Sequence, residues 1–225
     1  MDRMEWLRQR RAQVRADYDA EASDYDDNPY PTTRHGEFVD RLAASCPAGG
    51  VILDAPCGTG QYFPRIQDAG RRVVGIDQSS GMLAQARAKG VAEELHELGL
   101  QEMAFDAEFD GAMTVDAMEN VPPEDWPLVL HNLHRAVRPG GHVYLTVEEI
   151  ADADIDEAFR ENSERGLPAV RGEVIEGDVA GYHYYPGRDQ VRDWLISEGL
   201  TVLDEATEPQ DGWGYWHLLL GTPAR

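Results

Sequence analysis

The stretch Val51–Phe63, VILDAPCGTGQYF, decides the fold of this chain. Its first three residues form an apolar run typical of a strand that is buried on both faces. Gly58 and Gly60 have no Cβ, so the backbone there can take positive φ and bring main-chain N–H groups against a ligand. Asp54 ends the strand, where a doubly wound sheet opens its ligand crevice. The stretch therefore predicts a buried strand, a ligand-binding turn and the start of a helix.

A second acid follows the next buried strand. The run Val73–Ile76 comes after a helix expected over Tyr62–Ala69, and Asp77 ends it. An acid at this strand tip, about 20 residues past the glycine turn, is placed to accept bonds from both hydroxyls of a ribose. A dinucleotide site requires a third glycine where Phe63 stands. The pattern therefore favours S-adenosylmethionine, which has a ribose but no phosphate to cradle.

Five short motifs resemble those of class I S-adenosylmethionine-dependent methyltransferases, in the usual order of that family. They are DAPCGTG at 54–60, GIDQS at 75–79, FDG at 109–111, ENVP at 119–122 and RPGG at 138–141. The resemblance covers residues 51–149 and implies S-adenosylmethionine as cofactor, with S-adenosylhomocysteine as product. It also implies a doubly wound α/β fold with helices on both faces of a mostly parallel seven-stranded sheet, in the strand order 3-2-1-4-5-7-6. The family usually has glycine where this chain has Pro56, which has no N–H to offer a ligand.

The length of 225 residues fits one α/β domain with four consecutive parts. We expect an N-terminal helical lid at 1–45, a cofactor-binding core at 46–149, a substrate-cap insertion at 150–187, and a C-terminal helix with an antiparallel hairpin at 188–225.

The composition is strongly acidic, with a formal net charge of −22. Such a charge repels phosphate backbones and anionic lipids, so we expect neither nucleic acid nor membrane as a partner. We interpret the acidity as an aid to solubility rather than as steering of a cationic substrate. The sequence shows no membrane-length apolar run and no signal segment, and its two cysteines do not suggest disulfides. We expect a cytoplasmic protein, monomeric or homodimeric, that acts on a small molecule.

The cofactor is expected to contact the glycine turn, the two strand tips and the lid. The candidate contacts are Asp54, Pro56, Gly58, Gly60, Asp77, Gln78, Met82, Leu100, Gln101, Asp116, Tyr18 and Tyr25. For Met82 the alternative role is core filling at helical spacing. For the two tyrosines it is ordinary packing. Gln101 stands near the position where the family often has an acid for the adenine amino group, and its side-chain carbonyl can accept the same bond.

Methyl transfer is expected beyond the strand over Gly111–Val115. The reaction is an in-line displacement, so the protein must align a nucleophile about 3 Å from the methyl carbon. Glu119 is the predicted catalytic residue, because a partly buried carboxylate can have a raised pKa and accept a proton. The alternative role of Glu119 is to cap the next helix. Asn120 stands where some relatives have a histidine near a metal, so we predict no metal.

Substrate contacts are expected from the insertion and from residues near the strand tips. The candidates are Glu148, Tyr182, Tyr184, Tyr30 and Trp213, and His183 is a second candidate base. Alternation along a strand lets only one of the two sets, Tyr182 with Tyr184 or His183 with Tyr185, face a ligand. We interpret His35 as a surface or capping residue. Trp213 and Tyr215 are expected in the connection between the last two strands.

Together these features predict S-adenosylmethionine-dependent methyl transfer to a small-molecule acceptor. A binding or regulatory protein, or a cyclase, on the same scaffold remains open because a fold does not fix function. Phe63 disfavours a dehydrogenase. The sequence leaves open whether oxygen, nitrogen or carbon receives the methyl group.

Overall fold

The computed structural model describes residues 1–27, 33–175 and 181–224. Its main sheet has seven strands in the order β3-β2-β1-β4-β5-β9-β8. The strands are β1 (Val51–Asp54), β2 (Arg72–Asp77), β3 (Glu94–Glu97), β4 (Phe109–Thr114), β5 (Val137–Ile150), β8 (Thr201–Pro209) and β9 (Trp213–Gly221). The first five run parallel to their neighbours, and β9 lies antiparallel between β5 and β8. The predicted topology is confirmed, with β8 and β9 as the sixth and seventh strands of that order.

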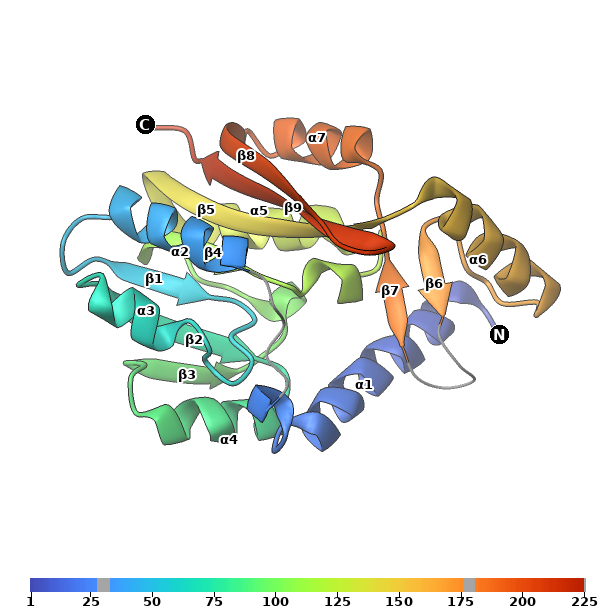
Figure 1. Cartoon of the computed structure of the whole chain (residues 1–225), viewed down its shortest axis with the longest axis horizontal. Helices are drawn as coiled ribbons and strands as arrows, with labels where there is room; N and C mark the ends of the chain where they lie inside the picture. Colours follow the sequence, from blue (N-terminus) through green and yellow to red (C-terminus); the bar gives the residue numbers. More distant parts are fainter. Residues whose placement is uncertain (28–32, 176–180, 225) are drawn as a thin grey trace.

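Helices cover both faces of the sheet (Figure 1). On one face lie α2 (Thr33–Ser45), α3 (Phe63–Asp68) and α4 (Ser80–Lys89), and on the other lie α5 (Trp126–Ala136) and α7 (Arg188–Ser197). Neighbouring residues of one strand serve the two faces, because Ile52 belongs to the hydrophobic cluster with α2, α3 and α4, and Leu53 to the cluster with α5 and α7. This is the burial on both faces that an unbroken apolar strand predicts.

Two glycines make room for a ring beneath the turn after β1. Phe63 is fully buried. A Cβ built on Gly60, which has φ of 74°, would lie 2.5 Å from the Phe63 ring, and one on Gly75 would lie 2.9 Å from it. Gly60 is therefore required both by its backbone conformation and by this close approach. The aromatic ring fills the space that a dinucleotide-binding turn leaves for close helix–strand packing.

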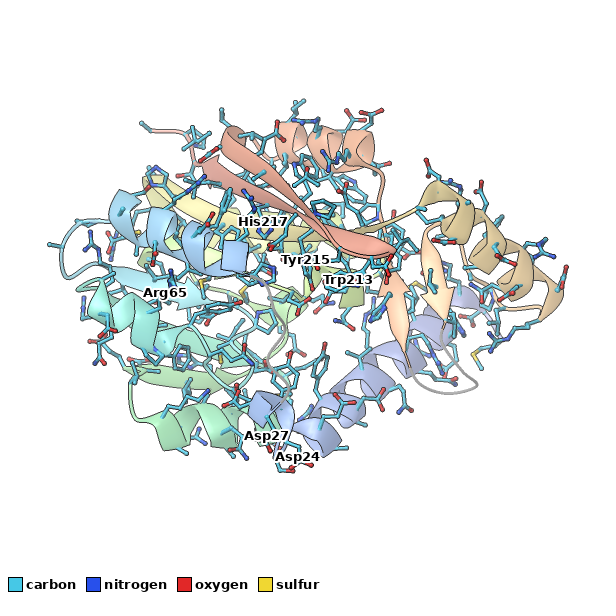
Figure 2. All side chains as sticks on the ribbon, in the orientation of Figure 1. Asp24, Asp27, Arg65, Trp213, Tyr215 and His217 are labelled. Carbon is cyan, nitrogen blue, oxygen red and sulfur yellow. The ribbon has the colours of Figure 1, made fainter. Side chains whose placement is uncertain are left out.

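The C-terminal hairpin is longer than the sequence predicted. Trp213 and Tyr215 lie within β9, where Tyr215 pairs with Glu208, so their expected placement in a connecting loop is wrong (Figure 2). A Cβ on Gly214, between these two residues, would lie 2.8 Å from the Glu208 carbonyl oxygen. A glycine in a strand can mark close approach of the neighbouring backbone, and that is its role here.

The N-terminal helix α1 (Arg3–Glu21) packs against α4, and the 3₁₀ turn η1 (Tyr25–Asp27) follows it. Asp19 accepts hydrogen bonds from Ser79 Oγ at 2.6 Å and from Gly81 N–H at 2.9 Å. Asp26 accepts from Thr59 Oγ1 at 2.5 Å and pairs with Lys89 at 2.8 Å. The last turn of α1 and the 3₁₀ turn η1 are thus both bonded to the core of the domain beside the glycine turn.

Replacing Asp19 with alanine is expected to loosen α1 from α4. The bonds from Ser79 and Gly81 lower the pKa of the Asp19 carboxyl, because they stabilise its charged form. Their contribution is therefore complete above the unfolded pKa and is lost as the pH falls through the lower folded pKa. Amide hydrogen exchange should show weaker protection of α1 in Asp19→Ala already at neutral pH. In the unaltered protein the same weakening should occur only in acid.

The matched control is Asp17→Ala, which removes a bond between Gln13 and Asp17 inside α1. Equal protection of α1 in the two variants would contradict the docking role of Asp19.

The insertion carries α6 (Asp152–Glu164) and a separate two-stranded sheet of β6 (Glu173–Ile175) and β7 (Tyr182–Tyr184). It lies beside the first turns of α1 (Figure 1). Arg3 of α1 reaches both Glu173 of β6, at 2.9 Å, and Glu124. In the described part of the chain, no helix has the length and apolar character to span a membrane.

Candidate functional site

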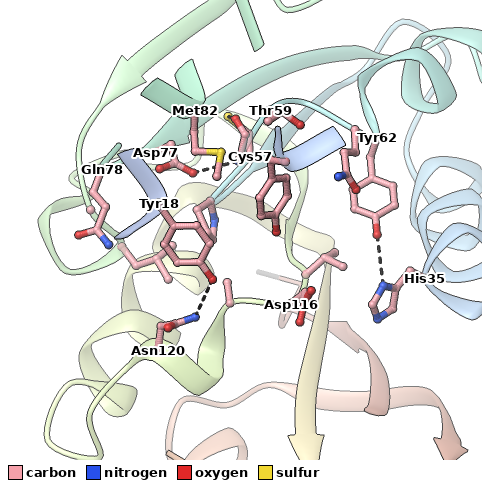
Figure 3. A pocket seen from close by; sticks show the side chains of 18 of the residues that line it. Tyr18, His35, Cys57, Thr59, Tyr62, Asp77, Gln78, Met82, Asp116 and Asn120 are labelled. Atoms are coloured by element: carbon pink, nitrogen blue, oxygen red, sulfur yellow. Dashed lines mark hydrogen bonds between the residues drawn. The ribbon is translucent and has the colours of Figure 1, made fainter. Parts of the chain in front are cut away.

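A cavity of about 740 Å³ opens at the carboxyl ends of β1, β2 and β4. Ten of the predicted cofactor contacts lie on its wall: Tyr18, Tyr25, Pro56, Gly58, Asp77, Gln78, Met82, Leu100, Gln101 and Asp116. In Figure 3, Asp77, Gln78 and Met82 lie on one side of this space, and His35, Tyr62 and Asp116 lie on the other. One cavity thus joins the tip of β2 to the region beyond β4.

The two acids of the first βαβ unit differ in their surroundings. Asp77 accepts hydrogen bonds from the N–H groups of Gly58, at 2.9 Å, and Ser79, at 2.8 Å. Each carboxylate oxygen has a second lone pair, so the group can still accept bonds from a ligand. Burial raises the pKa of Asp77, and the two N–H groups oppose that shift. These bonds fix the carboxylate at the edge of the cavity.

Asp54 lies behind the turn and not on the cavity wall. It is fully buried, and its Oδ2 has no hydrogen-bond partner among residues 1–27, 33–175 and 181–224. Burial, and then the charge of Asp77, raise its pKa well above the ordinary value. A buried oxygen without a partner is costly. Gly60 also lies off the cavity wall, and the Phe63 ring packs against it.

Gly58 fits a site that cradles a ligand. It has φ of 53°, and a Cβ built there would meet no atom within 4 Å. The side chain of any other residue would therefore project into open space on the cavity wall. Together with the carboxylate of Asp77, this turn suits a ligand that carries hydroxyl donors.

Another part of the cavity wall comes from the 3₁₀ turn η2 (Leu100–Glu102) and from Met82 of α4. Leu100 and Met82 are buried and supply apolar surface. The side-chain nitrogen of Gln101 donates to Asp125 at 3.1 Å. That bond orients the amide and leaves its carbonyl oxygen as the acceptor predicted for an adenine amino group.

Asp116 is held firmly at the far end. It follows β4 with φ of 52°, a conformation that residues other than glycine seldom adopt. Its N–H donates to Thr146 Oγ1 at 2.7 Å, and the Tyr215 hydroxyl donates to its Oδ1. Burial raises the pKa of Asp116, and the bond from Tyr215 opposes that rise. Strands β5 and β9 thus present this carboxyl to the cavity.

Glu119 lies next to that carboxyl, in the 3₁₀ turn η3 (Met118–Asn120), but outside the lining of the cavity. Its Oε1 accepts from Asn120 at 2.9 Å, and its Oε2 has no hydrogen-bond partner in the described structure. Burial, and then the charges of Asp116 and Glu148, raise its pKa well above the ordinary value. The N-cap of α5 is Asp125, so Glu119 does not cap that helix. Its catalytic role stays a prediction.

The interpretation of His35 as a surface residue is wrong. It is 2% exposed and lies between Tyr62, whose hydroxyl is 3.2 Å from its Nδ1, and the ring of Tyr215. Burial, and then the charge of His217, lower its pKa to about 3. The imidazole is therefore neutral at physiological pH. No local pattern around His35 predicts this burial, because the contacts come from β9 and from the start of α3.

The remaining candidates lie away from the cavity or outside the described residues. The Tyr182 hydroxyl donates to Glu173 at 2.6 Å, and its ring packs against Trp6. Tyr184 is also buried, His183 contacts the Tyr185 hydroxyl at 3.1 Å, and Trp213 packs edge-on against Tyr215. Within the described part of the insertion, no side chain lines the cavity. Tyr30 lies outside the described residues, and substrate contact by this group stays a prediction.

The wall also holds residues that were not among the predicted contacts, and four of these are Cys57, Thr59, Tyr62 and Arg11. The first three belong to the glycine-turn stretch, so their position in the sequence was an available signal. Arg11 comes from α1 and carried none. In the described structure, no cluster of His, Cys, Asp and Glu side chains is arranged to hold a metal ion.

The fold and the cavity define a doubly wound α/β protein with a cofactor crevice at a strand-order switch. Residues 52–141 match the methyltransferase domain family. The chain is 34% identical over 105 residues to a ubiquinone biosynthesis O-methyltransferase of Pseudomonas paraeruginosa, which covers 44% of each protein. It is 32% identical over 155 residues to a malonyl-[acyl-carrier protein] O-methyltransferase of Pectobacterium atrosepticum, which covers 65% of this chain and 59% of that relative. The matches thus span about half the length of these relatives.

Solved structures share the whole fold. The 1,6-didemethyltoxoflavin-N1-methyltransferase of Burkholderia thailandensis aligns with a TM-score of 0.70 at 19% identity, over 94% of this chain and 88% of that one. The magnesium protoporphyrin IX methyltransferase of Synechocystis aligns with a TM-score of 0.70 at 15% identity, over 95% and 99%. The match over residues 52–141 and the shared fold confirm the predicted resemblance to class I S-adenosylmethionine-dependent methyltransferases.

Proposed function

We propose that this protein transfers the methyl group of S-adenosylmethionine to a small-molecule acceptor by in-line displacement. The observation that carries the proposal is the single cavity that joins the glycine turn and Asp77 to a polar end at Asp116. S-adenosylmethionine supplies a methyl carbon already activated by a sulfonium. The task of the chain is therefore to bind, to orient and to exclude water.

The residues of the wall fit that cofactor in a consistent order. Asp77 and Gln78 would hold the ribose, and Leu100, Gln101 and Met82 the adenine. Gly58 and Pro56 would lie along the methionine end, with Asp54 behind them as an acceptor for its ammonium group. Tyr18 and Tyr25 would cover the cofactor from the lid. The two sequence relatives named above are O-methyltransferases by name, which supports oxygen as the acceptor atom, although the structural neighbour from Burkholderia thailandensis is an N1-methyltransferase.

Calorimetric titration of the purified protein tests this function. We expect micromolar binding of S-adenosylmethionine and S-adenosylhomocysteine and no binding of NAD. Binding of NAD alone would overturn the assignment. If none of the three ligands binds, a repurposed scaffold is favoured. If S-adenosylmethionine binds but no labelled methyl group passes to any metabolite, a regulatory protein or a cyclase is favoured.

A further inference from the structure

The far end of the cavity has the chemistry of an acceptor site. It is bounded by Asp116, by the hydroxyl of Tyr62 and by the neutral imidazole of His35, with Tyr25 on the lid side. Tyr62 and His35 contact each other, and His35 packs against Tyr215, so this end is rigid and largely aromatic. Flat aromatic walls favour a planar ring as the occupant.

Charge at the wall discriminates between kinds of acceptor. The cationic side chains among the described lining residues are Arg11 and Arg65. Arg11 donates twice to Asp125, at 2.5 and 2.9 Å. Arg65 forms a two-point ion pair with Asp40, at 2.6 and 2.7 Å. Both cations are thus engaged by carboxylates of this chain, while Asp68, Asp77 and Asp116 add negative charge. An anionic acceptor would meet repulsion here without a cation reserved for it.

We propose, on the basis of the proposed function, that the acceptor is a neutral phenol and that Asp116 accepts its proton, with Tyr215 as a positioning residue. The phenol oxygen forms a bond to the methyl carbon while the carbon–sulfur bond breaks. The electron pair of that bond stays on sulfur, which becomes neutral, and the phenolic proton passes to the Asp116 carboxylate. The acceptor therefore leaves as a methyl ether.

The geometry selects Asp116 over its neighbour Glu119 for this role. Asp116 lines the cavity, whereas Glu119 does not. Its strained backbone is retained by the bonds to Thr146 and Tyr215, and strain of this kind persists where surrounding structure fixes a residue for function. The Tyr215 hydroxyl occupies Oδ1, which fixes the plane of the carboxyl for the ligand.

Several titratable groups face Asp116 from the elements packed around it. They are Tyr215 from β9, Glu119 from η3, Tyr144 from β5, Tyr62 at the start of α3 and Tyr18 from α1. Glu148 of β5 acts on this set through Glu119 and Tyr215, and His35 of α2 acts through Tyr62 and Tyr215. The pH dependence of methyl transfer therefore reflects the titration of all these side chains together, and variants are needed to identify the contribution of Asp116.

The acceptor class is tested with two matched rings, catechol and benzoate, titrated into the protein saturated with S-adenosylhomocysteine. We expect catechol to bind at least about tenfold more tightly than benzoate, because a charge without a partner costs more than a kilocalorie per mole on burial. Asp116→Asn should reduce this preference, and Asp106→Asn, which alters an exposed residue outside the cavity lining, should not. Stronger binding of benzoate, or no binding of catechol, would overturn the acceptor class.

The proton-accepting role is tested by methyl transfer to catechol. Asp116→Asn should lower the rate by about 100-fold or more while S-adenosylhomocysteine affinity changes little. The loss should be largely repaired with 4-nitrocatechol, which is ionised near neutral pH and needs no base. A variant that remains equally slow with both rings would show a structural role only and would overturn the assignment.

Tyr215→Phe separates positioning from catalysis. Loss of the hydroxyl removes a bond to the charged form of Asp116, so the pKa of that carboxyl rises further. The rise of the transfer rate with pH should then move to higher pH, with a smaller loss at the plateau than in Asp116→Asn. An unmoved pH profile would contradict the positioning role. If S-adenosylhomocysteine itself fails to bind, the proposed function fails, whereas binding with a preference for benzoate defeats only this inference.

Discussion

Replacement of Asp77 by alanine is expected to weaken S-adenosylmethionine binding by more than any other single change at the cofactor end. A hydrogen bond to a charged group contributes about 1.5 to 3 kcal/mol, or a factor of about 10 to 150 in Kd. The variant would lose the bonds to the ribose hydroxyls. It would also lose those to the N–H groups of Gly58 and Ser79, which shape the glycine turn and the start of α4. Calorimetry with the cofactor measures the effect.

A suitable control is Asp68→Ala, because Asp68 also lies on the cavity wall but belongs to α3. It should leave cofactor affinity within about twofold, which is less than 0.5 kcal/mol. Both variants should keep the far-ultraviolet circular dichroism of the unaltered protein. An Asp77→Ala variant that is folded and binds with unchanged affinity would refute the assignment of this end of the cavity.

Truncation of Phe63 to alanine is expected to give the largest loss of stability. The ring is fully buried beneath the glycine turn, in the space that Gly60 and Gly75 leave free. Removing a buried phenylalanine side chain costs about 3 to 5 kcal/mol, from lost burial and from the cavity that remains. The free energy of unfolding in urea should fall by that amount. Cofactor affinity should fall as well, since the turn loses its support.

The chain offers a matched control in Phe159 of α6, which is 38% exposed. Its replacement by alanine should change the free energy of unfolding by about 0.5 kcal/mol or less, as surface substitutions usually do. Equal losses in the two variants would mean that packing beneath the turn does not stabilise the domain.

Local patterns were sufficient for the sheet and for the first half of the cavity wall. Apolar runs that end in Asp54 and Asp77 mark buried parallel strands, and carboxyl ends of such strands meet at one edge of a sheet. Gly58 and Asp77, which follow two neighbouring strands of the predicted sheet, are therefore expected to lie close together from the topology alone.

The sequence by itself thus determined the topology, the turn beneath which Phe63 packs, and the acid at the tip of β2. Only the tertiary structure decided the end of the cavity that we propose for the acceptor, where Asp116 meets Tyr215 from a strand 99 residues away and His35 is buried between two tyrosines. The physical reason is the range of the interactions. Strand burial, glycine turns and helix caps depend on residues close in the chain. The packing of β9 against β5 depends instead on contacts whose partners no local pattern specifies, and that packing brings a hydroxyl to a buried carboxyl.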